Sequence, residues 1–174
     1  MVRIAPPSAV VLEPIGREQA PVLHNLFELY AYDFSDVVPL ELKPNGRFDV
    51  SPGDGWWDRD EHFPFFIRWN GKLVGFALVR RGSRVTDADE PMDVAEFFVV
   101  RAARGNKVGA AAANALFAAF PDRWEIRVRR SNVSAMKFWS RTLEIWLGRP
   151  VTSDPFIAEG VDWDVLRIDS SRGR

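Results

Sequence analysis

One segment of the chain combines glycines and basic residues at the expected start of a helix. It has the sequence Arg104-Gly105-Asn106-Lys107-Val108-Gly109-Ala110 and lies between an apolar strand and an alanine-rich helix. Free N–H groups at a helix start attract anions, and glycines let the backbone come close to a ligand. The segment therefore predicts a pyrophosphate site. A plain strand-to-helix crossover, with glycines that serve packing, explains the same residues.

The spacing of these glycines differs from that of two common nucleotide-binding loops. No Gly-Lys-Ser/Thr follows at the spacing of a P-loop. The G-x-G-x-x-G pattern of dinucleotide-binding domains is also absent from this segment, as is its acidic residue further on.

A second segment with chemical interest is Arg130-Ser-Asn-Val-Ser-Ala-Met-Lys-Phe-Trp139. Asn132 is a preferred residue for capping a helix, and a small residue and two aromatic residues follow it. By itself this pattern predicts an ordinary capped helix of the core.

Hydrophobic periodicity indicates which elements must position these segments. Helical spacing predicts helices over residues 17–32, 107–120 and 132–143. Apolar and alternating runs predict strands over residues 10–12, 63–69, 72–80, 94–100, 124–128, 146–151 and 163–168. The dipeptide Asn70-Gly71 is typical of a tight hairpin turn, and residues 33–62 are mostly loop. The order predicts a mixed α/β domain whose sheet begins antiparallel.

Composition narrows the class of protein. The 174 residues are enough for a single domain, with 47% hydrophobic and 27% charged residues. The net charge of −1 gives no overall positive potential that would attract nucleic acid or an anionic membrane. No apolar stretch is long enough to span a bilayer. The N-terminus does not resemble a secretory signal peptide, so a cytoplasmic location is expected. With no cysteine and two histidines, we expect neither a disulfide nor a metal site.

Together, the two segments resemble the GNAT acetyltransferase superfamily. The cofactor loop of that family has the pattern Arg/Gln-x-x-Gly-x-Gly/Ala, which Arg104 to Gly109 match with one exception. Its next helix carries Asn-x-x-Ala-x-x-aromatic/Leu-Tyr, which is similar to the run from Asn132 to Trp139. The hairpin at Asn70-Gly71 also looks like the family hairpin. The resemblance covers residues 9–143 and points to bacterial acetyltransferases of unassigned substrate.

The resemblance implies one GNAT domain over residues 1–174, with a mostly antiparallel sheet of six to seven strands and about four helices. It implies an N-acetyltransferase with acetyl-CoA as co-substrate, no metal, and direct transfer in a ternary complex. The residues that it assigns to acetyl-CoA are Phe97, Phe98 and Val99 for the pantetheine arm, Arg104, Gly105, Asn106, Lys107, Val108, Gly109 and Ala110 for the pyrophosphate, and Asn132, Phe138 and Trp139 near the thioester. A backbone N–H near Val99 would polarise the acetyl carbonyl.

An ammonium substrate must lose a proton before it attacks, so a general base is needed. Glu96 is the first candidate, because it lies on the strand that leads to the cofactor loop, and Glu125 on the next strand is the alternative. Some family members carry a carboxylate five residues before the asparagine, but Arg127 occupies that position here.

The family builds its acceptor site from the first helix and the loop after it, here residues 37–62. The residues that fall there are Tyr30, Tyr32, Asp33, Trp56 and Trp57. Carboxylates beside aromatic rings suit a cationic amine of a small molecule or peptide. A solvated loop whose tryptophans fill the edge of the core is the other interpretation.

Two residues depart from the family pattern. Lys107 replaces the middle glycine of the loop, and Trp139 stands where many members carry a tyrosine that protonates the departing thiolate. An indole N–H is not a useful acid. These departures keep open a non-catalytic acyl-CoA-binding module, and a small phosphate-binding domain unrelated to CoA is a third hypothesis. No nucleic-acid or membrane partner is expected, and a homodimer through the last strands is expected from family analogy.

Overall fold

The computed structural model describes residues 9–86, 88 and 90–172. The strands in this part of the chain are β1 (Val10–Pro14), β2 (His62–Trp69), β3 (Lys72–Arg81), β4 (Met92–Val99), β5 (Arg123–Arg129), β6 (Ser153–Ala158) and β7 (Val161–Asp169). The α-helices are α1 (Ala20–Phe34), α2 (Val108–Ala119) and α3 (Val133–Leu147). Short 3-10 turns lie at η1 (Arg17–Gln19), η2 (Asp54–Trp57), η3 (Arg101–Ala103) and η4 (Ser170–Arg172).

The seven strands form one sheet in the order β1-β2-β3-β4-β5-β7-β6. All neighbours are antiparallel except β4 and β5, which are parallel. The register between β3 and β4 shifts where Leu78 faces Glu96 and Val79 faces Val94, so that Ala95 is an extra residue in β4. Such a bulge bends a strand and redirects its side chains.

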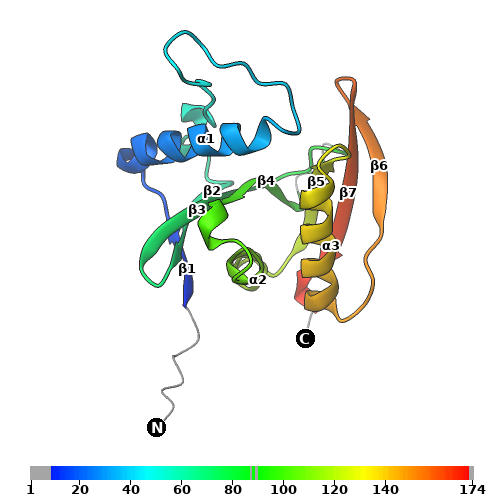
Figure 1. Cartoon of the computed structure of the whole chain (residues 1–174). Helices are drawn as coiled ribbons and strands as arrows, with labels where there is room; N and C mark the ends of the chain where they lie inside the picture. The colour runs from blue at the N-terminus through cyan, green and yellow to red at the C-terminus, as the bar shows by residue number, and fades with distance from the viewer. Residues whose placement is uncertain (1–8, 87, 89, 173–174) are drawn as a thin grey trace.

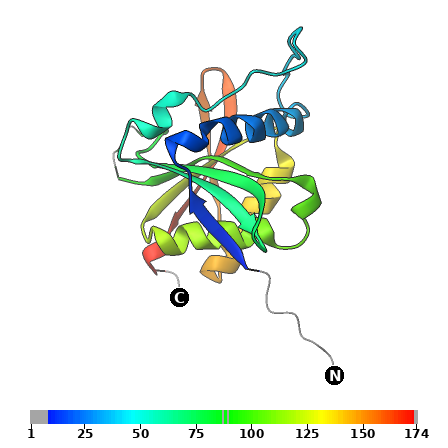
Figure 2. The same ribbon diagram turned by 90° about the vertical axis from the view of Figure 1, so that its left-hand side faces the viewer.

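Helices cover the two faces of the sheet unequally (Figures 1 and 2). On one face, α1 packs on β2, β3 and β4 through a core of aromatic residues that includes Phe27, Phe76 and Phe98. On the other face, α2 and α3 bury Phe117, Leu143 and the inward side chains of β5. The α1 face of β5, β7 and β6 therefore has no helix over it in the described part of the chain.

The central feature of the sheet is the separation of β4 from β5. These two strands pair at Met92–Trp124 and Asp93–Glu125, and their described residues beyond those positions do not pair with each other. Yet β4 continues to Val99 and β5 to Arg129. The two strands therefore separate after Asp93 and Glu125, and the gap between their backbones is called the cleft.

Most of the expected elements are present, but one strand was predicted wrongly. Residues 146–151 were expected to form a strand, whereas α3 continues to Leu147 and ends at Gly148, whose φ is 67°. Leu143, Trp146 and Leu147 follow at helical spacing, and a glycine in the left-handed conformation is a common helix stop. The strand that pairs with β7 is β6, further along the chain.

The connection of residues 35–61 runs back over α1, as Figure 2 shows. The Glu28 carboxylate of α1 holds it, because it accepts hydrogen bonds from the backbone N–H groups of Phe48 and Asp49, both at 2.9 Å. None of the described helices is long and apolar enough to cross a membrane.

Candidate functional site

The cleft between β4 and β5 exposes backbone groups of β4. The N–H of Val100 donates to the carbonyl of Val74 on β3 at 2.9 Å. Because successive peptide groups of a strand point to opposite sides, the N–H groups of Phe97 and Val99 point away from β3, toward the cleft. A ligand that enters the cleft can therefore pair with β4 as an added strand would.

The loop after β4 connects the strand that borders this cleft to the start of α2. Residues 104–107 are exposed, and the first N–H groups of α2 have no partner within the helix. Gly105 has a φ of 77° and Lys107 a φ of 61°. Lys107 therefore adopts the left-handed conformation that suits the glycine of the family pattern, at a cost of about 1–2 kcal/mol.

The side chain of Arg104 holds the loop in place. Its Nε donates to the carbonyl of Val99 at 2.7 Å, and its Nη2 lies 2.5 Å from Asp33 Oδ2. Arg101 Nε contacts the other Asp33 oxygen at 2.6 Å. Burial by itself would raise the pKa of Asp33, but the two arginine hydrogen bonds outweigh it and the pKa lies below the usual range. Asp33, predicted for the acceptor side, thus ties α1 to the loop.

The residues predicted near the thioester belong to α3 and its N-terminal cap, and Phe138 packs against α2. A Cβ added at Gly109 would lie 3.1 Å from Phe138, so the absence of a side chain at Gly109 allows this aromatic ring to pack there. Trp139 is 5% exposed and packs edge-on against Phe97 and Phe138. Asn132 Oδ1 accepts a hydrogen bond from the N–H of Ala135 at 2.9 Å, which caps α3. Trp139 is thus a core residue rather than an exposed acid.

Glu96 lies in the part of β4 that has separated from β5, on the α1 face. Its Oε2 accepts a hydrogen bond of 2.7 Å from the Tyr30 hydroxyl of α1. Burial raises the pKa of Glu96, and the Tyr30 hydrogen bond opposes this effect. Burial and the negative charge of Glu96 also raise the pKa of Tyr30, so that the phenol stays neutral. A half-buried carboxylate with a raised pKa has the properties of a general base.

A buried ion pair lies earlier on β4, and its charges act on the pKa of Glu96. Asp93 is fully buried and pairs with Arg80, whose Nη2 lies 2.7 Å from Asp93 Oδ2. Arg127 of β5 lies on the other side, with its Nε 3.7 Å from Asp93 Oδ1. This interaction bridges β4 and β5 near the point where they diverge.

Glu125, the alternative base, is in a different environment. Its carboxylate accepts a 2.5 Å hydrogen bond from the Ser83 hydroxyl and pairs with Arg167 Nε at 2.9 Å. It faces Asp93 in the paired part of the two strands and not in the cleft. The geometry therefore favours Glu96 over Glu125.

The other residues predicted for the acceptor differ in location. Trp56 is buried in the core under α1 and packs on His62. Trp57 Nε1 donates to the carbonyl of Ile15 at 2.9 Å. The two tryptophans thus fill the edge of the core, as the second interpretation of this loop holds. Tyr32 is 66% exposed on the outer side of α1.

Three further residues that could bind a ligand were not predicted as site residues from the sequence, namely Arg127, Arg129 and Trp163. The guanidinium carbons of the two arginines lie 5.2 and 5.0 Å from the centre of the Trp163 ring. Alternation along β5 signals that both arginines share a face, but the pairing of β5 with β7 is needed to bring Trp163 beside them.

The family model described as "Acetyltransferase (GNAT) family" matches residues 23–144. No curated protein sequence gives a significant match. An acetyltransferase from Thermus thermophilus has a TM-score of 0.64 at 16% identity, over 92% of this chain and 96% of that one. A chimera of the spermidine N-acetyltransferase SpeG from Vibrio cholerae and hSSAT has a TM-score of 0.62 at 14% identity, over 94% and 96%. The acetyltransferase yncA from Salmonella typhimurium, solved with its cofactor acetyl-CoA, has a TM-score of 0.60 at 12% identity, over 94% and 95%.

Proposed function

Because the chain belongs to the acetyltransferase (GNAT) family, we propose that it transfers an acetyl group from acetyl-CoA to a primary amine of a small molecule or peptide. The observation that carries the proposal is the position of Glu96. It is a half-buried carboxylate with a raised pKa, on the separated part of β4, with its orientation held by Tyr30. The acetyl-CoA in the yncA structure supports the choice of acyl donor.

The cleft suits the donor in three places. The N–H groups of Phe97 and Val99 would pair with the pantetheine arm, and the exposed loop with the start of α2 would hold the pyrophosphate. Phe138 and Trp139 would wall the thioester end. The co-substrate supplies an activated acetyl thioester, and one of the β4 N–H groups would stabilise the charge that develops on its carbonyl oxygen.

The chain then provides the proton chemistry. Glu96 accepts the proton of the substrate ammonium, so that the free amine nitrogen can bond to the acetyl carbonyl carbon. The carbon–sulfur bond breaks and sulfur leaves as a thiolate. Trp139 is buried and is not an acid, and the Tyr30 hydroxyl donates its hydrogen bond to Glu96 and has a raised pKa. The thiolate therefore takes its proton from water. With no cysteine in the chain, no cysteine thioester can form on the protein, and we propose direct transfer in a ternary complex.

Thiol release from acetyl-CoA in the presence of a panel of amines tests this function. We expect release that depends on the amine, with the N-acetylated amine identified by mass spectrometry. Binding of acetyl-CoA without release for any amine, across a panel of polyamines, amino acids, peptides and aminoglycosides, would contradict an enzyme and favour an acyl-CoA-binding module.

A further inference from the structure

A group of arginines lies on the open face of the sheet beside the cleft. Trp124, Ile126 and Val128 of β5 point into the core on the α2 and α3 side. The alternate residues Arg127 and Arg129 therefore lie on the α1 face, where Arg127 meets Asp93. The proposed acceptor site, which lies on this face, is thus bordered by positive charge.

The ring of Trp163 lies beside both guanidinium groups. Trp163 faces Arg129 in the pairing of β5 with β7, and both guanidinium carbons lie within 5.2 Å of its ring centre. Stacking on an aromatic ring leaves the N–H edges of a guanidinium free to donate. Two like charges beside one ring repel each other, and an anion between them would remove that repulsion.

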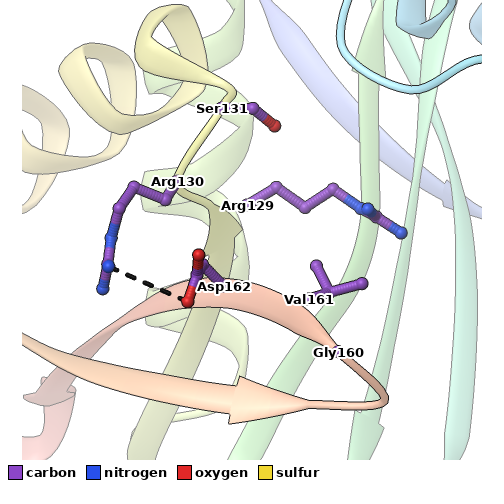
Figure 3. Close-up of a pocket in the computed structure, with 6 residues that line it drawn as sticks. All are labelled: Arg129, Arg130, Ser131, Gly160, Val161 and Asp162. Carbon is purple, nitrogen blue, oxygen red and sulfur yellow. Dashed lines mark ion pairs between the residues drawn. The ribbon is translucent and has the colours of Figure 1, made fainter.

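Arg129 has no anionic partner among the residues that the structure describes, for no carboxylate there lies within ion-pair distance of it. The nearest acids of β7, Asp162 and Asp164, are at 3.9 and 3.2 Å from Arg130 instead. Figure 3 shows that the side chains of Arg129 and Arg130 point in opposite directions. Arg130 turns to Asp162, whereas Arg129 extends past Val161.

Arg129 also lines a cavity of about 430 Å³, together with Arg130, Ser131 and the turn between β6 and β7. The cavity lies at the end of β5, beyond the residues of β5 that pair with β4. Tyr30 is close enough for the charge of Arg129 to act on its pKa, in the direction opposite to Glu96. Arg129 and the proposed base Glu96 thus lie on the same face of the sheet, and both act on Tyr30.

We propose that the acceptor amine also carries a carboxylate, and that Arg129 binds this carboxylate while Glu96 faces the amine. This inference rests on the proposed acetyl transfer and specifies its substrate class as amino acids or peptides with a free carboxylate. A guanidinium edge can donate two parallel hydrogen bonds to a carboxylate. A polycation is disfavoured here, because the guanidinium groups of Arg127 and Arg129 beside Trp163 would repel it.

Matched pairs of acceptors test the inference. We would measure kcat/KM for ω-amino acids of increasing chain length, from glycine upward, and for the carboxamide of each, with wild type, Arg129→Gln, Arg129→Lys and Arg149→Gln. Arg149 lines a separate cavity near Glu125 and is the matched control. At one or more chain lengths, wild type should prefer the acid over its amide by about 10- to 100-fold. Arg129→Gln should abolish this preference, Arg129→Lys should keep part of it, and Arg149→Gln should leave it unchanged.

A binding measurement separates this inference from the proposed function. Calorimetric titration with the N-acetylated acids and amides needs no turnover, and thermal stabilisation by acetyl-CoA reports on the donor site in every variant. Tighter binding of the acids to wild type, lost in Arg129→Gln with donor binding intact, would support the inference. Equal or better use of amides or polyamines would overturn the inference and leave acetyl transfer standing. If Arg129→Gln weakened acetyl-CoA binding as much as binding of the acids, the inference would also be overturned, since Arg129 would then contact the donor.

Discussion

Under the proposed function, the donor side and the acceptor side of the cleft are built from different groups. The donor side consists mainly of backbone: the N–H groups of β4, the exposed loop of residues 104–107 and the start of α2. The acceptor side consists of side chains from four elements, including Tyr30 of α1, Glu96 of β4, Arg129 of β5 and Trp163 of β7. Backbone groups bind a constant donor whatever the side chains are, whereas the acceptor side can change with single substitutions. Substrate choice should therefore depend on the acceptor side alone.

The largest effect that would test this division is expected for Glu96→Gln. Glutamine cannot accept the proton of the ammonium, so kcat should fall by about 10²- to 10⁴-fold, while acetyl-CoA affinity stays unchanged. Steady-state kinetics with an acceptor found in the amine panel, with donor binding by calorimetry, measures both quantities. Glu125→Gln is the matched control and should retain kcat. An equal fall in both variants would show that the loss is structural.

A smaller effect is expected for Tyr30→Phe. Glu96 acts as a carboxylate, so kcat/KM should rise with pH through the Glu96 pKa, which lies above the usual value for a glutamate. The Tyr30 hydrogen bond stabilises the charged form, and its loss should move this limb to higher pH by about one unit. The pH profile of kcat/KM shows the shift. Tyr32→Phe, at an exposed tyrosine on the same helix, should leave the limb at the same pH. If the limb also stays at the same pH in Tyr30→Phe, Tyr30 does not stabilise the charged form of Glu96.

The smallest effect concerns the donor side and is expected for Lys107→Gly. Glycine relieves the left-handed strain at this position but adds chain entropy to the unfolded state. The free energy of unfolding should rise by about 0.5–1 kcal/mol, as measured by urea denaturation. Asn106→Gly, at a neighbour without a positive φ, should lower it. A similar loss in both variants would mean that the Lys107 side chain contributes contacts that outweigh the strain.

The same contrast explains how much could be predicted from the sequence. The proposed donor side lies mainly in one continuous stretch, from β4 through the loop to α2, so its glycines form a local pattern. The asparagine cap of α3 adds a second local pattern further along the chain. The family and the fold follow from that pattern and are confirmed by the matching family model and the similar structures.

The acceptor side could not be predicted to the same depth, because long-range pairing assembles it. Trp163 meets Arg129 only through the register of β7 on β5. Asp33 and the two tryptophans at residues 56 and 57 have the composition of a cation site, yet Asp33 is occupied by Arg101 and Arg104 and Trp56 is buried. Composition alone does not distinguish a carboxylate that faces a ligand from one that holds a loop.

Thermal unfolding with and without acetyl-CoA tests the central claim most directly, namely that the cleft between β4 and β5 binds the acyl donor. ATP and NADH are the controls, since they also carry phosphates but no pantetheine arm. At about 100 times its dissociation constant, acetyl-CoA should add about 2.7 kcal/mol to the free energy of unfolding, with no comparable effect of ATP or NADH. No shift with millimolar acetyl-CoA, or an equal shift with ATP, would contradict the claim and remove the basis for acetyl transfer in this cleft.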